Sequence, residues 1–192
     1  MQGLRVLYDA IPWFLVLAAP VALATWAFAR RRHRELPVRE RRLRLALNVA
    51  LAWCLLGIAC VTLLPTPPGQ TGLEWGLQLR PFVSIVDELN SAIDASVAFR
   101  IVGLNIVLFI PLGFLLRIRP IGWLPTIAVV AAISLAIESL KAVLPLGRTT
   151  NIDDVLLNTL GGILGAGVAG LALRTRRRPQ IRSADAVQQQ DA

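Results

Sequence analysis

Ionisable side chains occur inside long apolar stretches of this chain. Glu138 lies within such a stretch, and Lys141 follows three residues later. An ionisable group in an apolar span is costly unless it is paired or hydrated, so Glu138 suggests a functional site. The i, i+3 spacing places Lys141 on the same helical face, close enough to neutralise the carboxylate. A purely structural ion pair is the alternative interpretation.

Two adjacent carboxylates, Asp153 and Asp154, follow shortly after Arg148. Asn151 is a plausible helix N-cap, which places both carboxylates in a first turn, where they complement free N–H groups and the helix dipole. Capping accounts for one carboxylate, whereas two exceed its needs, and Arg148 offers a counter-charge. We therefore interpret the pair as functional, with pure capping as the alternative.

The face that carries Asp154 continues through Asn158, Gly161 and Gly165, at spacings of four, three and four residues. Gly161 and Gly165 form a GxxxG pattern beside Gly162, and such small residues let helices approach each other closely. The pattern predicts helix packing at the glycines. It also predicts that Asp154 and Asn158 point into a helical bundle.

Two polar residues elsewhere complete the candidate site. Asn105 lies near the start of another apolar stretch, where it either bonds between helices or belongs to a site, and Arg80 lies in a mostly acidic segment. Guanidinium groups suit phosphate or carboxylate, and carboxylates beside them could act as acid or base or hold a cation. The predicted ligand-binding residues are Arg80, Asn105, Glu138, Arg148, Asp153, Asp154 and Asn158.

Residues typical of common catalytic centres are scarce. The single histidine, His33, belongs to an arginine-rich run, and Cys54 and Cys60 lie inside an apolar block without metal-ligand spacing. No metalloprotease, serine-hydrolase, Walker or zinc pattern is present. We therefore expect no metal site and no cofactor.

Composition identifies the elements that must position these residues. The 192 residues are 55% hydrophobic and 17% charged, which departs from a soluble domain with about 25% charged residues. About 20 mostly apolar residues span a bilayer, and five stretches approach or reach that length. The sequence predicts an all-α integral membrane bundle with spans at about 11–29, 45–64, 101–116, 123–140 and 155–173.

The positive charges predict the orientation of this bundle. Fifteen of the twenty Lys and Arg residues fall on one side of the predicted spans, in the 30–44 loop, the 117–119 turn and the tail after residue 173. Because cytoplasmic loops are enriched in Lys and Arg, we expect the N-terminus outside and the C-terminus in the cytoplasm. The net charge of +8 is then mostly a matter of topology and of contact with membrane lipids, and nucleic acid is not an expected partner.

The remaining segments flank this core. The longest outer loop, residues 65–99, contains an amphipathic pattern over 86–97 that predicts a short helix on the membrane surface or a lid on the bundle. We divide the chain into a first span with its basic loop (1–44), a membrane domain (45–173) and a tail (174–192) that is basic and then disordered from Ser183.

Four motifs carry a resemblance to a known family. They are Arg80-Pro-Phe82, the stretch from Asn105 to Gly113, Glu138-Ser-Leu-Lys141 and the stretch from Arg148 to Gly162. Together they resemble the VanZ-like family of bacterial membrane proteins, which is associated with teicoplanin and glycopeptide resistance. The resemblance implies a multi-pass protein of the cell membrane. Lys141 departs from the family's usual Glu-x-x-Gln pattern and could cancel the charge of Glu138.

Three functions remain open from the sequence. The first is binding of an anionic lipid or lipid-linked cell-wall precursor at an outward-facing polar cluster, which would contribute to teicoplanin tolerance. The second is a structural protein whose polar cluster locks the bundle. The third is a lipid headgroup hydrolase that uses a metal ion or acid–base chemistry.

Overall fold

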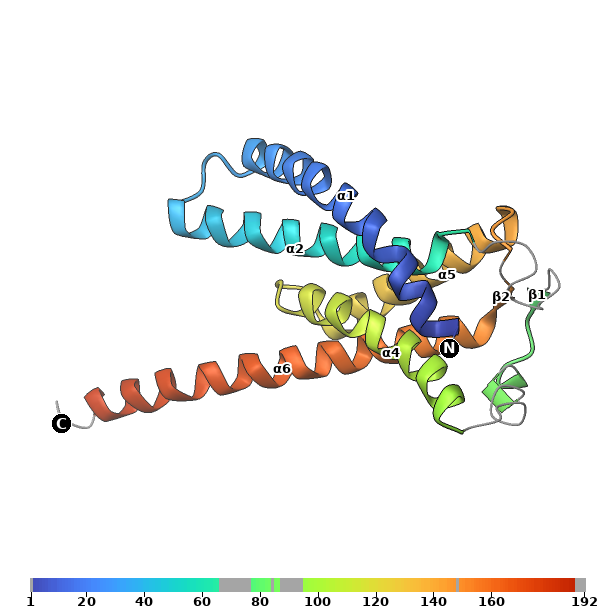
Figure 1. Cartoon of the computed structure of the whole chain (residues 1–192). Coiled ribbons are helices and arrows are strands. Elements are labelled where there is room, and N and C mark those ends of the chain that lie inside the picture. The colour runs from blue at the N-terminus through green and yellow to red at the C-terminus, as the bar shows by residue number, and fades with distance from the viewer. Residues whose placement is uncertain (1, 66–76, 84, 87–94, 148, 189–192) are drawn as a thin grey trace.

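The described residues of the computed structural model form five long helices and one short strand pair (Figure 1). The structure describes residues 2–65, 77–83, 85–86, 95–147 and 149–188. The all-α prediction is confirmed. The elements are α1 (Gln2–Arg32), α2 (Val38–Leu63), β1 (Leu77–Gln78), α4 (Ala95–Arg117), α5 (Trp123–Val143), β2 (Thr150–Asn151) and α6 (Ile152–Gln188).

Four helical segments are long and apolar enough to cross a membrane: Tyr8–Arg32, Val38–Leu63, Trp123–Val143 and Ile152–Thr175. The fifth apolar helical segment, Val102–Arg117, is shorter. The whole of α4 has 23 residues, which at about 1.5 Å per residue is close to the thickness of a bilayer core. Which terminus lies outside stays a prediction.

Several helix boundaries differ from the sequence-based ones. α2 begins at Val38, seven residues before the predicted span, because the Arg, Leu and Glu residues that precede the span are good helix formers. The predicted surface helix over 86–97 falls largely on residues 87–94, which lie outside the described residues, and its end forms the start of α4. α6 continues to Gln188, past Ser183, where we expected disorder to begin.

The helices form two groups. α1 lies against α2, while α4 and α5 both lie against α6, with α2 contacting α4 between the groups. In Figure 1 the α1–α2 turn, the α4–α5 turn and the C-terminus lie toward one end of the molecule, and β1 and β2 lie at the other. The polar residues that the sequence singled out therefore belong to the strand end.

Glycines set the distance between α4 and α6. A Cβ atom on Gly161 would collide with the carbonyl oxygen of Ile106, and one on Gly165 would collide with that of Ile110. A Cβ atom on Gly162 would meet Val130 of α5. Only residues without a side chain permit this backbone approach, as the packing role predicted for these glycines requires.

Candidate functional site

Asp154 joins three helices at the strand end of the bundle. It lies in the first turn of α6, and its Oδ1 accepts a 2.9 Å hydrogen bond from Nδ2 of Asn105 on α4. Its Oδ2 lies 3.2 Å from Nζ of Lys141 on α5. The prediction that this face of α6 points into the bundle is confirmed, and Asn105 bonds between helices as one of its two interpretations required.

Lys141 is shared between two carboxylates. Its Nζ also lies 2.7 Å from Oε1 of Glu138, and both side chains of this pair are almost fully buried. The predicted i, i+3 ion pair is confirmed, whereas the second partner, Asp154, was not predicted. Two carboxylates therefore face one ammonium group in a buried setting, where charges interact strongly.

Glu138 also holds the chain segment that enters α6. Its Oε2 accepts a 3.1 Å hydrogen bond from the backbone N–H of Asn151, and its backbone oxygen accepts one of 3.3 Å from Oγ1 of Thr150. Since Thr150 and Asn151 form β2, the carboxylate fixes the strand against the end of α5. Both oxygens of Glu138 are thus occupied within the protein.

Asp153 anchors a distant loop segment. Its own N–H is capped by Oδ1 of Asn151 at 2.9 Å, so the predicted N-cap is confirmed. Its carboxylate is 1% exposed and accepts hydrogen bonds from the N–H of Phe82 at 2.6 Å and of Ile85 at 3.3 Å. Asp153 therefore ties the 80–86 segment to the start of α6, a role that differs from simple capping.

The backbone conformation of Phe82 indicates that its contact with Asp153 restrains the chain. Its φ angle is 67°, a left-handed conformation that is uncommon for a residue with a bulky side chain. Such conformations cost about 1–3 kcal/mol and persist where the surroundings enforce them. The two hydrogen bonds to Asp153 supply that restraint.

The strand pair connects residues 77–78, just before Arg80, to the same end of the bundle. β1 pairs in parallel with β2, with Leu77 opposite Thr150 and Gln78 opposite Asn151. This pairing could not be predicted from the sequence, because two residues are too few for a strand pattern. Through β2 the pairing is continuous with the bonds that Glu138 makes.

Asn158 lies one turn deeper than Asp154. Its Nδ2 donates a 2.9 Å hydrogen bond to Oγ of Ser134 on α5, and both residues are buried. Its Oδ1 has no hydrogen-bond partner among the described residues. Sequence reasoning missed Ser134, although its position four residues before Glu138 places it on the same face of α5.

The structure thus assembles a polar cluster, a name we use below for Asn105, Ser134, Glu138, Lys141, Asp153, Asp154 and Asn158. Arg80 lies at its edge, in the segment that Asp153 anchors, and is exposed. No described acidic residue forms an ion pair with Arg80. Arg148, the second predicted cation, lies outside the described residues.

The carboxylates of the polar cluster chiefly hold other segments of the chain in position. The carboxylates of Glu138, Asp153 and Asp154 accept hydrogen bonds from backbone or side-chain groups of three other segments. Within the described part of the chain, no group of three or more His, Cys, Asp or Glu residues is arranged to hold a metal ion. The exposed cation of Arg80 is the group best placed to meet a ligand from outside.

Comparisons with known proteins agree with the resemblance in the motifs. The family model described as VanZ/LLP1 matches residues 49–173. Protein VanZ of Enterococcus faecium is 41% identical over 70 residues, which cover 35% of this chain and 43% of that protein. The match therefore spans less than half of that relative's length. No solved structure matches the chain.

Proposed function

The chain belongs to the VanZ/LLP1 family, and we propose that it is a multi-pass protein of the cell membrane that binds an anionic lipid headgroup. The ligand class is a phosphate carried on an apolar chain, such as a lipid-linked cell-wall precursor. The binding site is the strand end of α4, α5 and α6, which the distribution of positive charge predicts to be the outer end.

A single observation carries this proposal: the buried carboxylate of Asp153 fixes the backbone at Phe82 and Ile85. Arg80 lies two residues before Phe82, is exposed and has no described acidic partner. A guanidinium group is a preferred partner of phosphate, because its planar fork donates two parallel hydrogen bonds. Pre-positioning of that group lowers the entropy lost on binding.

The family resemblance extends the proposal to antibiotic response. VanZ-like proteins are associated with teicoplanin resistance, and a protein that engages a lipid-linked precursor would alter how much of it a glycopeptide meets. We expect deletion of this chain to increase teicoplanin sensitivity. Complementation with wild type should restore tolerance, and complementation with Arg80→Gln at equal membrane abundance should not. Unchanged sensitivity after deletion would contradict this part of the proposal.

A structural role is the second candidate. The ammonium group of Lys141, which pairs with both Glu138 and Asp154, favours it. Lys141 links α5 to α6 through Asp154, and Asp154 links α6 to α4 through Asn105. If the cluster only locks the bundle, Arg148→Ala should unfold the protein in detergent instead of leaving a folded, inactive one, and Arg80→Gln should not remove a ligand. If the cluster serves binding, Arg80→Gln should leave a folded protein that has lost its ligand.

A further inference from the structure

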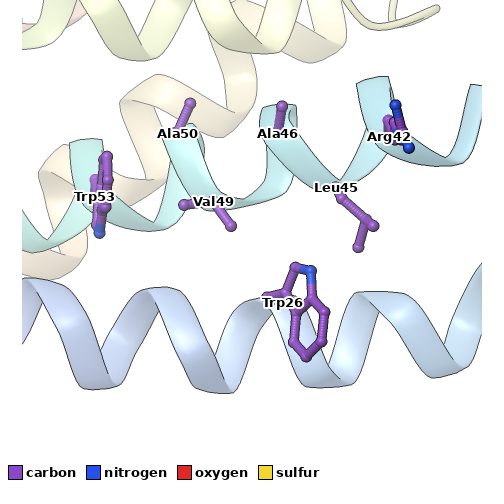
Figure 2. A pocket seen from close by; sticks show the side chains of 7 residues that line it. All are labelled: Trp26, Arg42, Leu45, Ala46, Val49, Ala50 and Trp53. Carbon is purple, nitrogen blue, oxygen red and sulfur yellow. The ribbon is translucent and has the colours of Figure 1, made fainter. Parts of the chain in front are cut away.

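An apolar slot lies between α1 and α2, at the end of the molecule opposite the polar cluster (Figure 2). Its volume is about 440 Å³. Ala46 and Ala50 on α2 leave room for it, and Leu45 and Val49 add apolar surface. Figure 2 shows the indole of Trp26 on α1 directed toward α2.

The two ends of the slot differ. Trp53 lies at the inner end, where its Nε1 donates a 2.9 Å hydrogen bond to the backbone oxygen of Ala18, so α1 and α2 are tied together there. Arg42 lies at the other end. The slot therefore has an aromatic end at Trp53 and a cationic end at Arg42, which we call its mouth.

The mouth carries a second cation. The guanidinium carbon of Arg30 lies 5.0 Å from the ring centre of Trp26, which lines the slot. Among the described residues neither Arg30 nor Arg42 forms an ion pair, and the nearby Glu40 is bonded to Arg44 at 2.6 Å. Arg42, which lines the slot, and Arg30, which lies over the Trp26 ring, therefore have no described acidic partner that would compete with an anion.

The length of the slot indicates the kind of chain that fits. Arg42 and Trp53 are eleven residues apart on α2, or about 16 Å at 1.5 Å per residue. That is roughly half of the 30 Å hydrocarbon core of a bilayer, the depth of one leaflet. A phospholipid acyl chain has this reach, whereas a long polyprenyl chain exceeds it.

We propose that this slot binds one acyl chain of an anionic phospholipid, with its phosphate on Arg42 and Arg30. The site is separate from the polar cluster and lies in the leaflet on the basic side, which we predict to be cytoplasmic. Arginine near a membrane surface attracts anionic lipid, and the apolar slot converts that attraction into a defined position. This lipid would stabilise the packing of α1 on α2.

Native mass spectrometry of the full chain tests the proposal, with phosphatidylglycerol and phosphatidylcholine of identical acyl chains as probes. We expect wild type to retain phosphatidylglycerol preferentially, and Arg42→Gln to lower its affinity about fivefold. Ala46→Phe, which fills the slot without changing charge, should lower the affinity for phosphatidylglycerol. Arg39→Gln and Leu43→Phe, exposed positions on α2 outside the slot, are the matched controls.

A second readout measures fluorescence quenching by the bound lipid. Phosphatidylglycerol brominated on its acyl chains should quench the fluorescence of Trp26 and Trp53, so Trp26→Phe should remove more of the quenching than Trp13→Phe. Equal phosphatidylglycerol affinity for wild type, Arg42→Gln and Ala46→Phe would overturn the proposal. Preferential retention of a polyprenyl phosphate at the same residues would overturn the choice of ligand.

Discussion

Asp153 and Phe82 are 71 positions apart in the chain, yet Oδ1 of Asp153 accepts a 2.6 Å hydrogen bond from the backbone N–H of Phe82. The second oxygen accepts the N–H of Ile85. One buried carboxylate therefore fixes the backbone at Phe82 and Ile85 to the start of α6, where the first turn of the helix supplies a favourable field for it. This contact connects the membrane bundle to its exposed cation, Arg80.

Asp153→Asn should release the 80–86 segment. An amide offers one oxygen in place of two, so one of the two N–H groups loses its acceptor, at a cost of about 1–3 kcal/mol. Hydrogen–deuterium exchange should then be faster at Phe82 and Ile85, while α5 keeps its protection. Asp9→Asn, an exposed carboxylate on α1, is the control. Unchanged exchange at both amides would show that Asp153 does not anchor the segment.

Lys141→Gln should destabilise the protein strongly, because it leaves the buried Glu138 and the half-buried Asp154 without their shared cation. Loss of one partner of a buried ion pair typically costs about 3–5 kcal/mol. Addition of Asp154→Asn removes one of the two negative charges, so the double variant should recover part of the loss. Thermal unfolding in detergent measures both effects.

The exposed pair of Arg44 and Glu40 gives the matched comparison for Lys141. Its side chains are 50% and 44% exposed, and exposed ion pairs contribute about 0–1 kcal/mol. Arg44→Gln should therefore shift the unfolding temperature little. Equal shifts for Arg44→Gln and Lys141→Gln would mean that the buried network does not stabilise the bundle.

Gly165→Ala should separate α4 from α6, because its Cβ would collide with the backbone of Ile110. Overpacking of this kind costs about 1–3 kcal/mol. Gly167→Ala, two residues along the same helix, should be tolerated, since its Cβ would be 3.9 Å from the nearest atom, on Trp123. The difference in unfolding temperature between the two variants is the measurement, and similar values would argue against close α4–α6 packing.

Local patterns in the sequence were sufficient to predict the helices and the role of the glycines in helix packing. Apolar stretches, the i, i+3 spacing of Glu138 and Lys141 and the GxxxG pattern of Gly161 and Gly165 all lie within one element. The N-cap at Asn151 is likewise local. Each of these predictions depends only on helix periodicity or on a capping residue type, which the sequence displays directly.

Contacts between segments could not be predicted in the same way. The partners of Asp153 are backbone N–H groups, which every residue except proline carries, so no residue type marks them. The contact between Lys141 and Asp154 depends on how α5 lies against α6. For this reason the sequence identified most members of the polar cluster, but it missed Ser134 and did not distinguish the separate roles of Asp153 and Asp154.

The affinity of the full chain for a polyprenyl phosphate in phosphatidylcholine nanodiscs tests the central claim most directly. A charge-assisted hydrogen bond to phosphate contributes about 1.5–3 kcal/mol, which corresponds to roughly 10–100-fold in affinity. We predict a loss of that size for Arg80→Gln, with an unchanged unfolding temperature, and a smaller loss for Asp153→Asn. Wild-type affinity in Arg80→Gln would contradict the claim that the polar cluster positions Arg80 to bind an anionic headgroup.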